Sequence, residues 1–241
     1  MKLLNGDCLK LMKEIPDGAV DLILCDLPYG TTDCSWDRVL PFEELWEEYD
    51  RLLKQDGAAV LFSAQPFTTQ LIMSNKKAFR YCWYWLKNTP TGFTYARYQP
   101  MRRVEDICVF YRKHGTYNAQ GLKEIEQPRH KKKKLPKGDA IYKMSTLLKE
   151  YTPRFTNWPK NVLEYNSERG YHPTQKPVPL LEYLVRTYTN EGDTVLDNCM
   201  GSGSTGVAVK RVGGRHFIGI EQNKVYFDIA QERIRKETTK C

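Results

Sequence analysis

The segment best suited to chemistry follows an apolar run near the start of the chain. Val20–Cys25 is apolar enough to form a buried strand, and the acid Asp26, Pro28 and the aromatic Tyr29 follow it. Ligands of open α/β sheets bind at the carboxyl ends of strands. A carboxylate placed there can accept hydrogen bonds from the exocyclic amine of a base. Such bonds oppose delocalisation of the nitrogen lone pair and stabilise the positive charge that grows as nitrogen attacks a methyl group.

The neighbours of Asp26 suit the same chemistry. A backbone carbonyl near Leu27 would be a second acceptor for the amine, and Tyr29 would offer a stacking face to a base extruded from its duplex. Pro28 would stiffen the turn that positions both groups. However, Asp, Pro and Gly also occur in ordinary turns after strands, so both interpretations stay open on this segment alone.

A second candidate site is a glycine-rich turn late in the chain. The apolar run Thr194–Leu196 leads through Asp197 into glycines at 201, 203 and 206, which permit a tight turn and close approach of a ligand to the backbone. Glu221 ends the next apolar run, where nucleotide-binding folds place an acid for the ribose hydroxyls. The pattern fits NAD, FAD and S-adenosylmethionine equally well, and it lacks the Lys-Ser/Thr ending of a P-loop.

Short apolar runs alternate with helical patterns through most of the chain. The expected strands are Lys2–Leu4, Val20–Cys25, Ala58–Ser63, Tyr81–Leu86, Asp106–Tyr111, Thr194–Leu196 and Arg215–Ile220. The expected helices are Cys8–Ile15, Phe42–Leu53, Pro66–Asn75, Pro179–Tyr188, Gly203–Arg211 and Lys224–Arg235. Several strands are apolar on both faces, which is typical of a sheet covered by helices on both sides. We therefore predict one doubly wound α/β sheet that carries both candidate sites.

The positive charge of the chain is confined to one segment. The whole chain carries a net charge of +8, while residues 112–160 hold 13 Lys and Arg against four acids. The rest is close to neutral. This distribution is typical of a surface that binds a polyanion, although a run such as 129–134 is by itself also typical of a solvated loop. Because periodicity fades from 112 to 170, we interpret those residues as an inserted lobe.

Composition narrows the class of protein further. The sequence has no apolar stretch near the roughly 20 residues that cross a bilayer, and its beginning lacks the apolar run of a signal peptide. We expect a soluble, cytoplasmic protein without a membrane partner. Its seven cysteines contain no CxxC pair. That spacing suits neither a zinc site nor a disulfide framework, so we expect no structural metal.

Four segments together resemble a known family. Asp26-Leu27-Pro28-Tyr29 resembles the Asp-Pro-Pro-Tyr tetrad of amino-group DNA methyltransferases, and residues 196–206 resemble their cofactor loop. Residues 172–177, with the sequence HPTQKP, resemble the segment near the methionine end of the cofactor, and residues 5–8 resemble the motif that meets its adenine. The order of tetrad, variable region and cofactor loop is similar to the beta class of this family.

The resemblance implies a Rossmann-like S-adenosylmethionine-dependent methyltransferase fold in circularly permuted order. It implies a catalytic half at 1–111, a target-recognition insertion at 112–170 and a cofactor-binding half at 171–241. The implied activity is sequence-specific methyl transfer from S-adenosyl-L-methionine to a flipped base of double-stranded DNA, with adenine N6 favoured because Asp stands at position 26. Its relatives suggest a homodimer and a cognate restriction enzyme.

The residues that the resemblance and the charge pattern assign fall into three groups. The catalytic residues are Asp26, Leu27, Pro28 and Tyr29. The cofactor-binding residues are Asp7, Cys8, Asp26, Thr174, Lys176, Asp197, Asn198, Gly201, Ser202, Gly203 and Glu221. Lys176 is expected to meet the cofactor carboxylate. The DNA-binding residues are Arg102, Arg103, Arg129, Lys131, Lys132, Lys133 and Lys134.

Two departures from the family pattern keep alternatives open. Leu27 stands where proline is usual, and Asn198-Cys199 replaces the usual Pro-Phe beside the cofactor. The backbone carbonyl survives the first change, so we expect activity to survive. The alternatives are a cytosine-N4 or RNA methyltransferase, and a catalytically silent DNA-binding scaffold.

Overall fold

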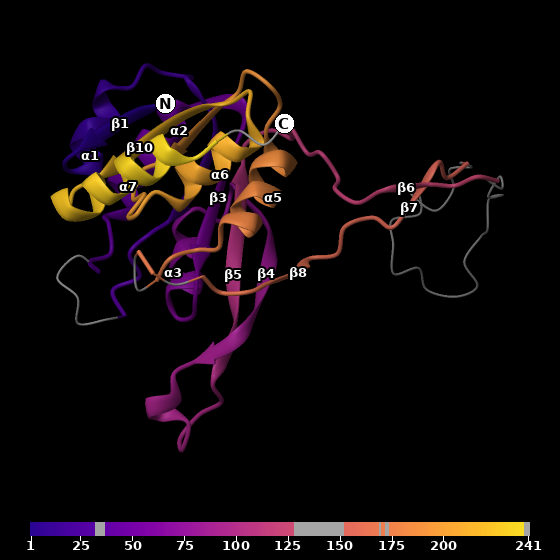
Figure 1. The fold of residues 1–241 in the computed structure, drawn as a ribbon, viewed down its shortest axis with the longest axis horizontal. Coiled ribbons are helices and arrows are strands. Elements are labelled where there is room, and N and C mark those ends of the chain that lie inside the picture. Colours follow the sequence, from indigo (N-terminus) through magenta and orange to yellow (C-terminus); the bar gives the residue numbers. More distant parts are fainter. Residues whose placement is uncertain (32–36, 128–151, 169, 172–173, 239–241) are drawn as a thin grey trace. The chain divides into compact units, whose positions relative to one another are not determined.

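The structure is a computed structural model that describes residues 1–31, 37–127, 152–168, 170–171 and 174–238. It divides into two compact units (Figure 1). The larger unit consists of residues 1–118 and 161–241, and the smaller consists of residues 119–160.

An eight-stranded sheet forms the centre of the larger unit. Its order is β1 (Lys2–Asn5), β10 (His216–Glu221), β9 (Thr194–Asp197), β2 (Val20–Asp26), β3 (Leu53–Ser63), β5 (Arg102–Tyr111), β4 (Phe79–Thr91) and β8 (Val162–Tyr165). The first five strands are parallel, and β5 runs antiparallel to both of its neighbours. β8 pairs in parallel with β4.

Helices cover both faces of the sheet. On one face lie α1 (Cys8–Leu11), the 3-10 turn η1 (Met12–Glu14), α2 (Phe42–Leu52) and α3 (Phe67–Ser74). On the other lie α5 (Val178–Tyr188), α6 (Ser204–Val212) and α7 (Lys224–Lys236) (Figure 1). β2 shows why, because Leu22 and Leu24 pack into one core while Ile23 and Cys25 pack into the other. The doubly wound α/β sheet predicted from the sequence is confirmed.

The two candidate sites meet at the middle of the sheet. β9 and β2 lie far apart in the sequence but pair in parallel, with Leu22 opposite Val195 and Ile23 opposite Leu196. From β9 the chain passes through α6 to β10, and from β2 it passes through α2 to β3 on the other side. Strand order thus reverses between β9 and β2, and such reversals create the ligand crevice of open α/β sheets. Asp197 and Asp26 end these two strands.

The hairpin formed by β4 and β5 is longer than the sequence predicts. Its strands continue past the predicted bounds, and a 3-10 turn, η2 (Phe93–Tyr95), lies near its tip. Figure 1 shows this hairpin extending away from the sheet. Phe93, Tyr95 and Tyr98 there are 82%, 61% and 86% exposed, so the tip presents large aromatic rings to solvent.

The smaller unit holds a short two-stranded sheet. β6 (Lys123–Glu124) pairs antiparallel with β7 (Phe155–Thr156), and Arg154 lies 3.3 Å from the Glu124 carboxylate. This unit is narrower than the predicted insertion at 112–170, because β8 belongs to the large sheet. The predicted DNA-binding residues Arg129, Lys131, Lys132, Lys133 and Lys134 lie outside the residues that the structure describes.

Candidate active site

A cavity of about 630 Å³ opens at the carboxyl ends of β2 and β9. It joins the two motifs that the sequence keeps apart. The predicted site residues that line it are Asp7, Cys8, Asp26, Leu27, Pro28, Tyr29, Arg102, Thr174, Lys176, Asp197, Asn198, Gly201, Ser202 and Glu221. Gly203 and Arg103 are not among its lining residues.

The Asp26 carboxylate is held by two side chains. Its Oδ1 accepts a 2.6 Å hydrogen bond from the Tyr29 hydroxyl, and its Oδ2 accepts a 2.5 Å bond from the Lys176 ammonium. Burial raises the pKa of Asp26, which the Lys176 charge opposes. Burial and the Asp26 charge also raise the pKa of Tyr29 well above its usual value, so the phenol keeps its proton and donates.

The rest of the tetrad is fixed by packing. The Tyr29 ring stacks on Phe67 with centroids 5.0 Å apart and planes at 25°. Leu27 is buried in the core on the same face of the sheet. Asp37, which the sequence did not single out, accepts backbone hydrogen bonds from Gly30 and Thr31 and so holds the turn that follows Tyr29.

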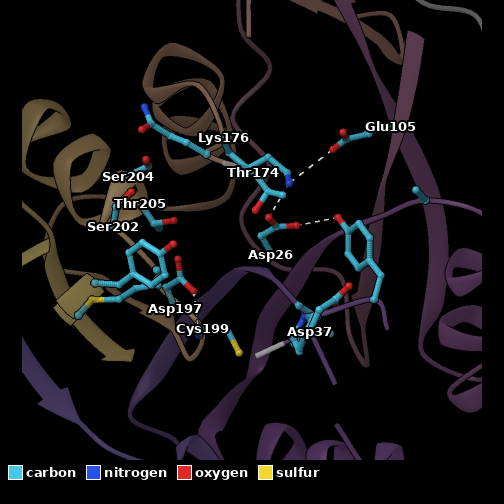
Figure 2. Close-up of a pocket in the computed structure, with 18 of the residues that line it drawn as sticks. Asp26, Asp37, Glu105, Thr174, Lys176, Asp197, Cys199, Ser202, Ser204 and Thr205 are labelled. Carbon is cyan, nitrogen blue, oxygen red and sulfur yellow. Dashed lines mark hydrogen bonds and ion pairs between the residues drawn. The ribbon is translucent and has the colours of Figure 1, made fainter. Parts of the chain in front are cut away.

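Lys176 lies between two acids (Figure 2). Its ammonium is 2.5 Å from Asp26 and 3.5 Å from Glu105 Oε2, and the Lys176 side chain is only 8% exposed. Burial acts to lower the pKa of Lys176, but the two carboxylates outweigh it and raise the pKa. Its expected contact with the cofactor carboxylate stays a prediction. Its partners in the structure are these acids.

Glu105 and Lys87 are site residues that the sequence analysis missed. Glu105 on β5 lines the cavity, and its Oε1 accepts a 2.8 Å hydrogen bond from Lys87 on β4. Burial acts to raise the pKa of Glu105, but the charges of Lys176 and Lys87 outweigh it and lower the pKa. Glu105 comes just before the predicted strand Asp106–Tyr111, in a charged stretch that gives no signal of a site, and only the fold shows which lysines it meets.

The opposite wall of the cavity carries acids bonded to backbone. Glu221 accepts hydrogen bonds from the backbone N–H groups of Gly201, at 2.9 Å, and Asn223, at 2.7 Å. Asp197 accepts one from the Cys199 backbone at 3.1 Å. Burial raises the pKa of Asp197 to about 7, despite hydrogen bonds from Thr205 and Cys199 that lower it. Figure 2 shows Asp197 and Thr205 across the cavity from Lys176.

Two of the loop glycines also have a packing role that the sequence did not predict. A Cβ on Gly203 would lie 2.8 Å from the Ala230 Cβ, and a Cβ on Gly206 would lie 2.3 Å from the Ile234 Cδ1. Both neighbours belong to α7. Close packing of α6 on α7 therefore favours glycine at 203 and 206, and the left-handed φ of 80° at Gly203 adds a second reason, because it fits the predicted tight turn.

The unusual loop residue Asn198 has its own anchor. Asn198 is 1% exposed, and its Oδ1 accepts a 2.6 Å hydrogen bond from the Tyr49 hydroxyl on α2. Asp7, another residue that lines the cavity, caps α1 by accepting hydrogen bonds from the backbone N–H groups of Leu9 and Lys10. At position 198, where the family usually has proline, this chain therefore has an asparagine whose side chain is hydrogen-bonded to α2.

The two predicted hairpin arginines differ in position. Arg102 lines the cavity, whereas Arg103 donates a 2.9 Å hydrogen bond from Nε to the Lys87 carbonyl.

Within the described ranges, no cluster of His, Cys, Asp or Glu could hold a metal ion. No helix among those residues is long and apolar enough to span a membrane.

Comparison with known proteins identifies similar chains. The family model described as DNA methylase matches residues 20–232. The chain is 30% identical to Type II methyltransferase M.HpaI of Haemophilus parainfluenzae over 98% of its own length and 74% of the relative. It is 27% identical to Type II methyltransferase M.HinfI of Haemophilus influenzae over 97% of its length and 68% of the relative.

Solved structures show the same fold. The crystal structure of the M1.HpyAVI–SAM complex superposes with a TM-score of 0.65 at 25% identity, covering 96% of this chain and 98% of that one. PvuII DNA methyltransferase (cytosine-N4-specific) gives 0.69 at 16% identity, over 96% of this chain and 85% of that one. The expected methyltransferase fold is confirmed.

Proposed function

This chain belongs to the DNA methylase family of amino-group methyltransferases, and from that membership we propose that it methylates the N6 amine of adenine in double-stranded DNA. Its cofactor is S-adenosyl-L-methionine. The observation that carries the proposal is the pairing of β2 with β9, which brings Asp26 and the glycine-rich loop to one cavity.

The donor set of the cavity fits this cofactor. S-adenosylmethionine carries a positive sulfonium and a ribose, and the wall of the cavity opposite Asp26 offers the carboxylates of Asp197 and Glu221. The Glu221 carboxylate accepts backbone hydrogen bonds, among them those from Gly201 and Asn223, and its four lone pairs leave room for a ribose hydroxyl. We propose that Glu221 holds the ribose and that Asp7 and Cys8 meet the adenine.

The chemistry of transfer then falls to the tetrad. When bound, the cofactor supplies an electrophilic methyl carbon. Asp26 and the Leu27 backbone carbonyl accept the two N–H groups of the amine, which concentrates the nitrogen lone pair and stabilises the developing positive charge. Tyr29, held by Phe67, stacks on the flipped base. As the nitrogen bonds to the methyl carbon, the S–CH3 bond would break and the sulfonium would leave as a neutral thioether. The nitrogen would then release one proton to Asp26 or to water.

We propose that residues 112–170 read the target sequence. Their positive charge supports contact with the DNA backbone, which positions a protein to read bases, because lysines and arginines that neutralise phosphates release condensed counterions. DNA affinity should therefore fall steeply between low and physiological salt. The proposed place of action is the cytoplasm, where bacterial DNA lies, and a homodimer and a restriction partner stay predictions.

Nucleoside analysis tests the proposed substrate. The protein is incubated with labelled S-adenosylmethionine and either unmethylated bacterial DNA or RNA, and the digested nucleosides are separated. We expect label in N6-methyldeoxyadenosine. Label in N4-methyldeoxycytidine or in RNA would replace adenine DNA as the substrate. No transfer, together with no calorimetric binding of S-adenosylmethionine, would favour the silent scaffold.

A further inference from the structure

Four charged side chains form a row of alternating sign beside the cavity. Asp26 pairs with Lys176 at 2.5 Å, Lys176 lies 3.5 Å from Glu105, and Glu105 pairs with Lys87 at 2.8 Å. The two lysines are 8% and 5% exposed. They come from separate elements, with Lys176 just before α5 and Lys87 on β4. A buried row of this kind balances its own charge.

One atom in this row lacks a hydrogen bond. Among the described residues, the buried Glu105 Oε2 has no hydrogen bond shorter than its 3.5 Å contact with the Lys176 ammonium, while Glu105 Oε1 accepts a 2.8 Å hydrogen bond from Lys87. A buried carboxylate oxygen without a donor is costly, and such groups in native proteins call for an explanation. The nearest cation is the Lys176 ammonium, which hydrogen-bonds Asp26 in the structure. Figure 2 shows Lys176 reaching between the two acids.

The bond between Lys176 and Asp26 opposes the chemistry assigned to Asp26. An ammonium on Oδ2 draws electron density from the carboxylate and occupies the oxygen that does not hold Tyr29. An amine bound there would meet a weakened acceptor. Activation of the amine is stronger if the ammonium moves off Asp26 while staying close to a negative charge.

We propose that Glu105 is a positioning residue that takes the Lys176 ammonium from Asp26 when the target amine enters the cavity. This inference rests on the proposed function. Lys176 keeps its three protons, one hydrogen bond leaves Asp26 Oδ2, and one forms to Glu105 Oε2. Lys87 keeps Glu105 in place and Tyr29 keeps Asp26 in place, so only one side chain moves.

The charge balance makes this exchange feasible in a buried site. The ammonium stays between the same two carboxylates throughout, so no charge is left without a counter-charge. The Lys176 ammonium lies 2.5 Å from Asp26 and 3.5 Å from Glu105, so rotation of the Lys176 side chain is enough to move it from the first acid to the second. The orphaned Glu105 oxygen is the vacant place that the exchange fills.

The test compares two substitutions at Glu105 with a matched control. Glu105→Gln keeps the shape and removes the charge, and Glu105→Asp keeps the charge on a shorter side chain. Glu182→Gln makes the same change at another buried, ion-paired glutamate, which pairs with Arg186 and Arg211 and does not line the cavity. Each variant is assayed for single-turnover methylation at saturating cofactor and DNA, for cofactor Kd by calorimetry, and for Tm.

We expect Glu105→Gln to slow methylation about 10- to 100-fold while the cofactor Kd stays within about 2-fold. Glu105→Asp should keep most of the wild-type methylation rate, and Glu182→Gln should methylate at the wild-type rate. Three results would overturn the inference. They are an unchanged rate in Glu105→Gln, an equal loss in both Glu105 variants, or a loss fully explained by weaker cofactor binding. A wild-type protein that methylates no base would instead refute the proposed function.

Discussion

The two walls of the cavity hold their carboxylates in different ways. Asp26 is bonded by two side chains, those of Tyr29 and Lys176, whereas Glu221 is bonded by backbone N–H groups, among them those of Gly201 and Asn223. Side chains can rotate to other partners, and backbone groups in a packed turn cannot. The Asp26 wall is therefore suited to a reaction in which bonding changes, and the Glu221 wall is suited to holding a ligand in one place.

The largest effect should follow a change at Asp26. Asp26→Asn keeps the shape and removes the acceptor charge, so the methylation rate should fall about 10³-fold, while the cofactor Kd measured by calorimetry should change little. Asp106→Asn is the control, because Asp106 lies on β5, bonds Thr68 and does not line the cavity. Equal activity in the two variants would remove Asp26 from the chemistry.

Glu221 should show the reverse pattern. Glu221→Ala removes the carboxylate that accepts from Gly201 and Asn223 and that we propose as the acceptor for the ribose, so the cofactor Kd should rise about 100-fold, or about 2.7 kcal/mol. At saturating cofactor the rate should recover most of its wild-type value. Glu232→Ala, an exposed glutamate paired with Lys236 on α7, serves as the control. If the cofactor Kd of Glu221→Ala equals that of Glu232→Ala, the Glu221 wall does not hold the cofactor.

Packing beneath the cofactor wall predicts a smaller effect on stability. Gly206→Ala places a methyl group against Ile234 and Phe217, so the free energy of unfolding in urea should fall by about 1–3 kcal/mol. Adding Ile234→Val should restore part of it by removing the nearest atom. Unchanged stability in Gly206→Ala would show that α6 can shift on α7, and the wall would then be less rigid than described.

The smallest effect concerns pH. Because burial raises the pKa of Asp197 to about 7, the folded state holds a proton that the unfolded chain releases. The stability that this proton confers is present at low pH and is lost as pH rises through 7, by about 1.4 kcal/mol between pH 6 and 8. Urea unfolding at both pH values should show this difference, and Asp197→Asn should lack it. A loss of the same size in the variant would assign it to another group.

Much of the fold was predictable because its signals are local. The helix predicted at Phe42–Leu53 is observed as α2 (Phe42–Leu52), since its apolar residues recur at helical spacing. The parallel strands were predicted from their continuous apolar runs. β8 was missed because only Leu163 among its four residues is buried, which leaves no periodic pattern to detect.

The parts of the site that could not be predicted depend on tertiary pairing. The sequence pointed to Asp26 and Lys176 as site residues but did not predict that Glu105 and Lys87 lie beside them. That proximity depends on the pairing of β4 with β5, which brings Glu105 and Lys87 together. The link between Tyr49 and Asn198 also joins distant segments. At Gly203 the tight turn was predicted but the packing against Ala230 was not, because Ala230 lies on a helix later in the chain.

A crystal structure of the protein with S-adenosylhomocysteine and DNA carrying its mapped target would test the contrast between the two walls most directly. We predict that the Lys176 ammonium is hydrogen-bonded to Glu105 Oε2 and that the target amine is hydrogen-bonded to Asp26, while Glu221 keeps its bonds to Gly201 and Asn223. A Lys176 that still bonds Asp26 with the amine in place, or a Glu221 that has exchanged its backbone partners, would contradict it.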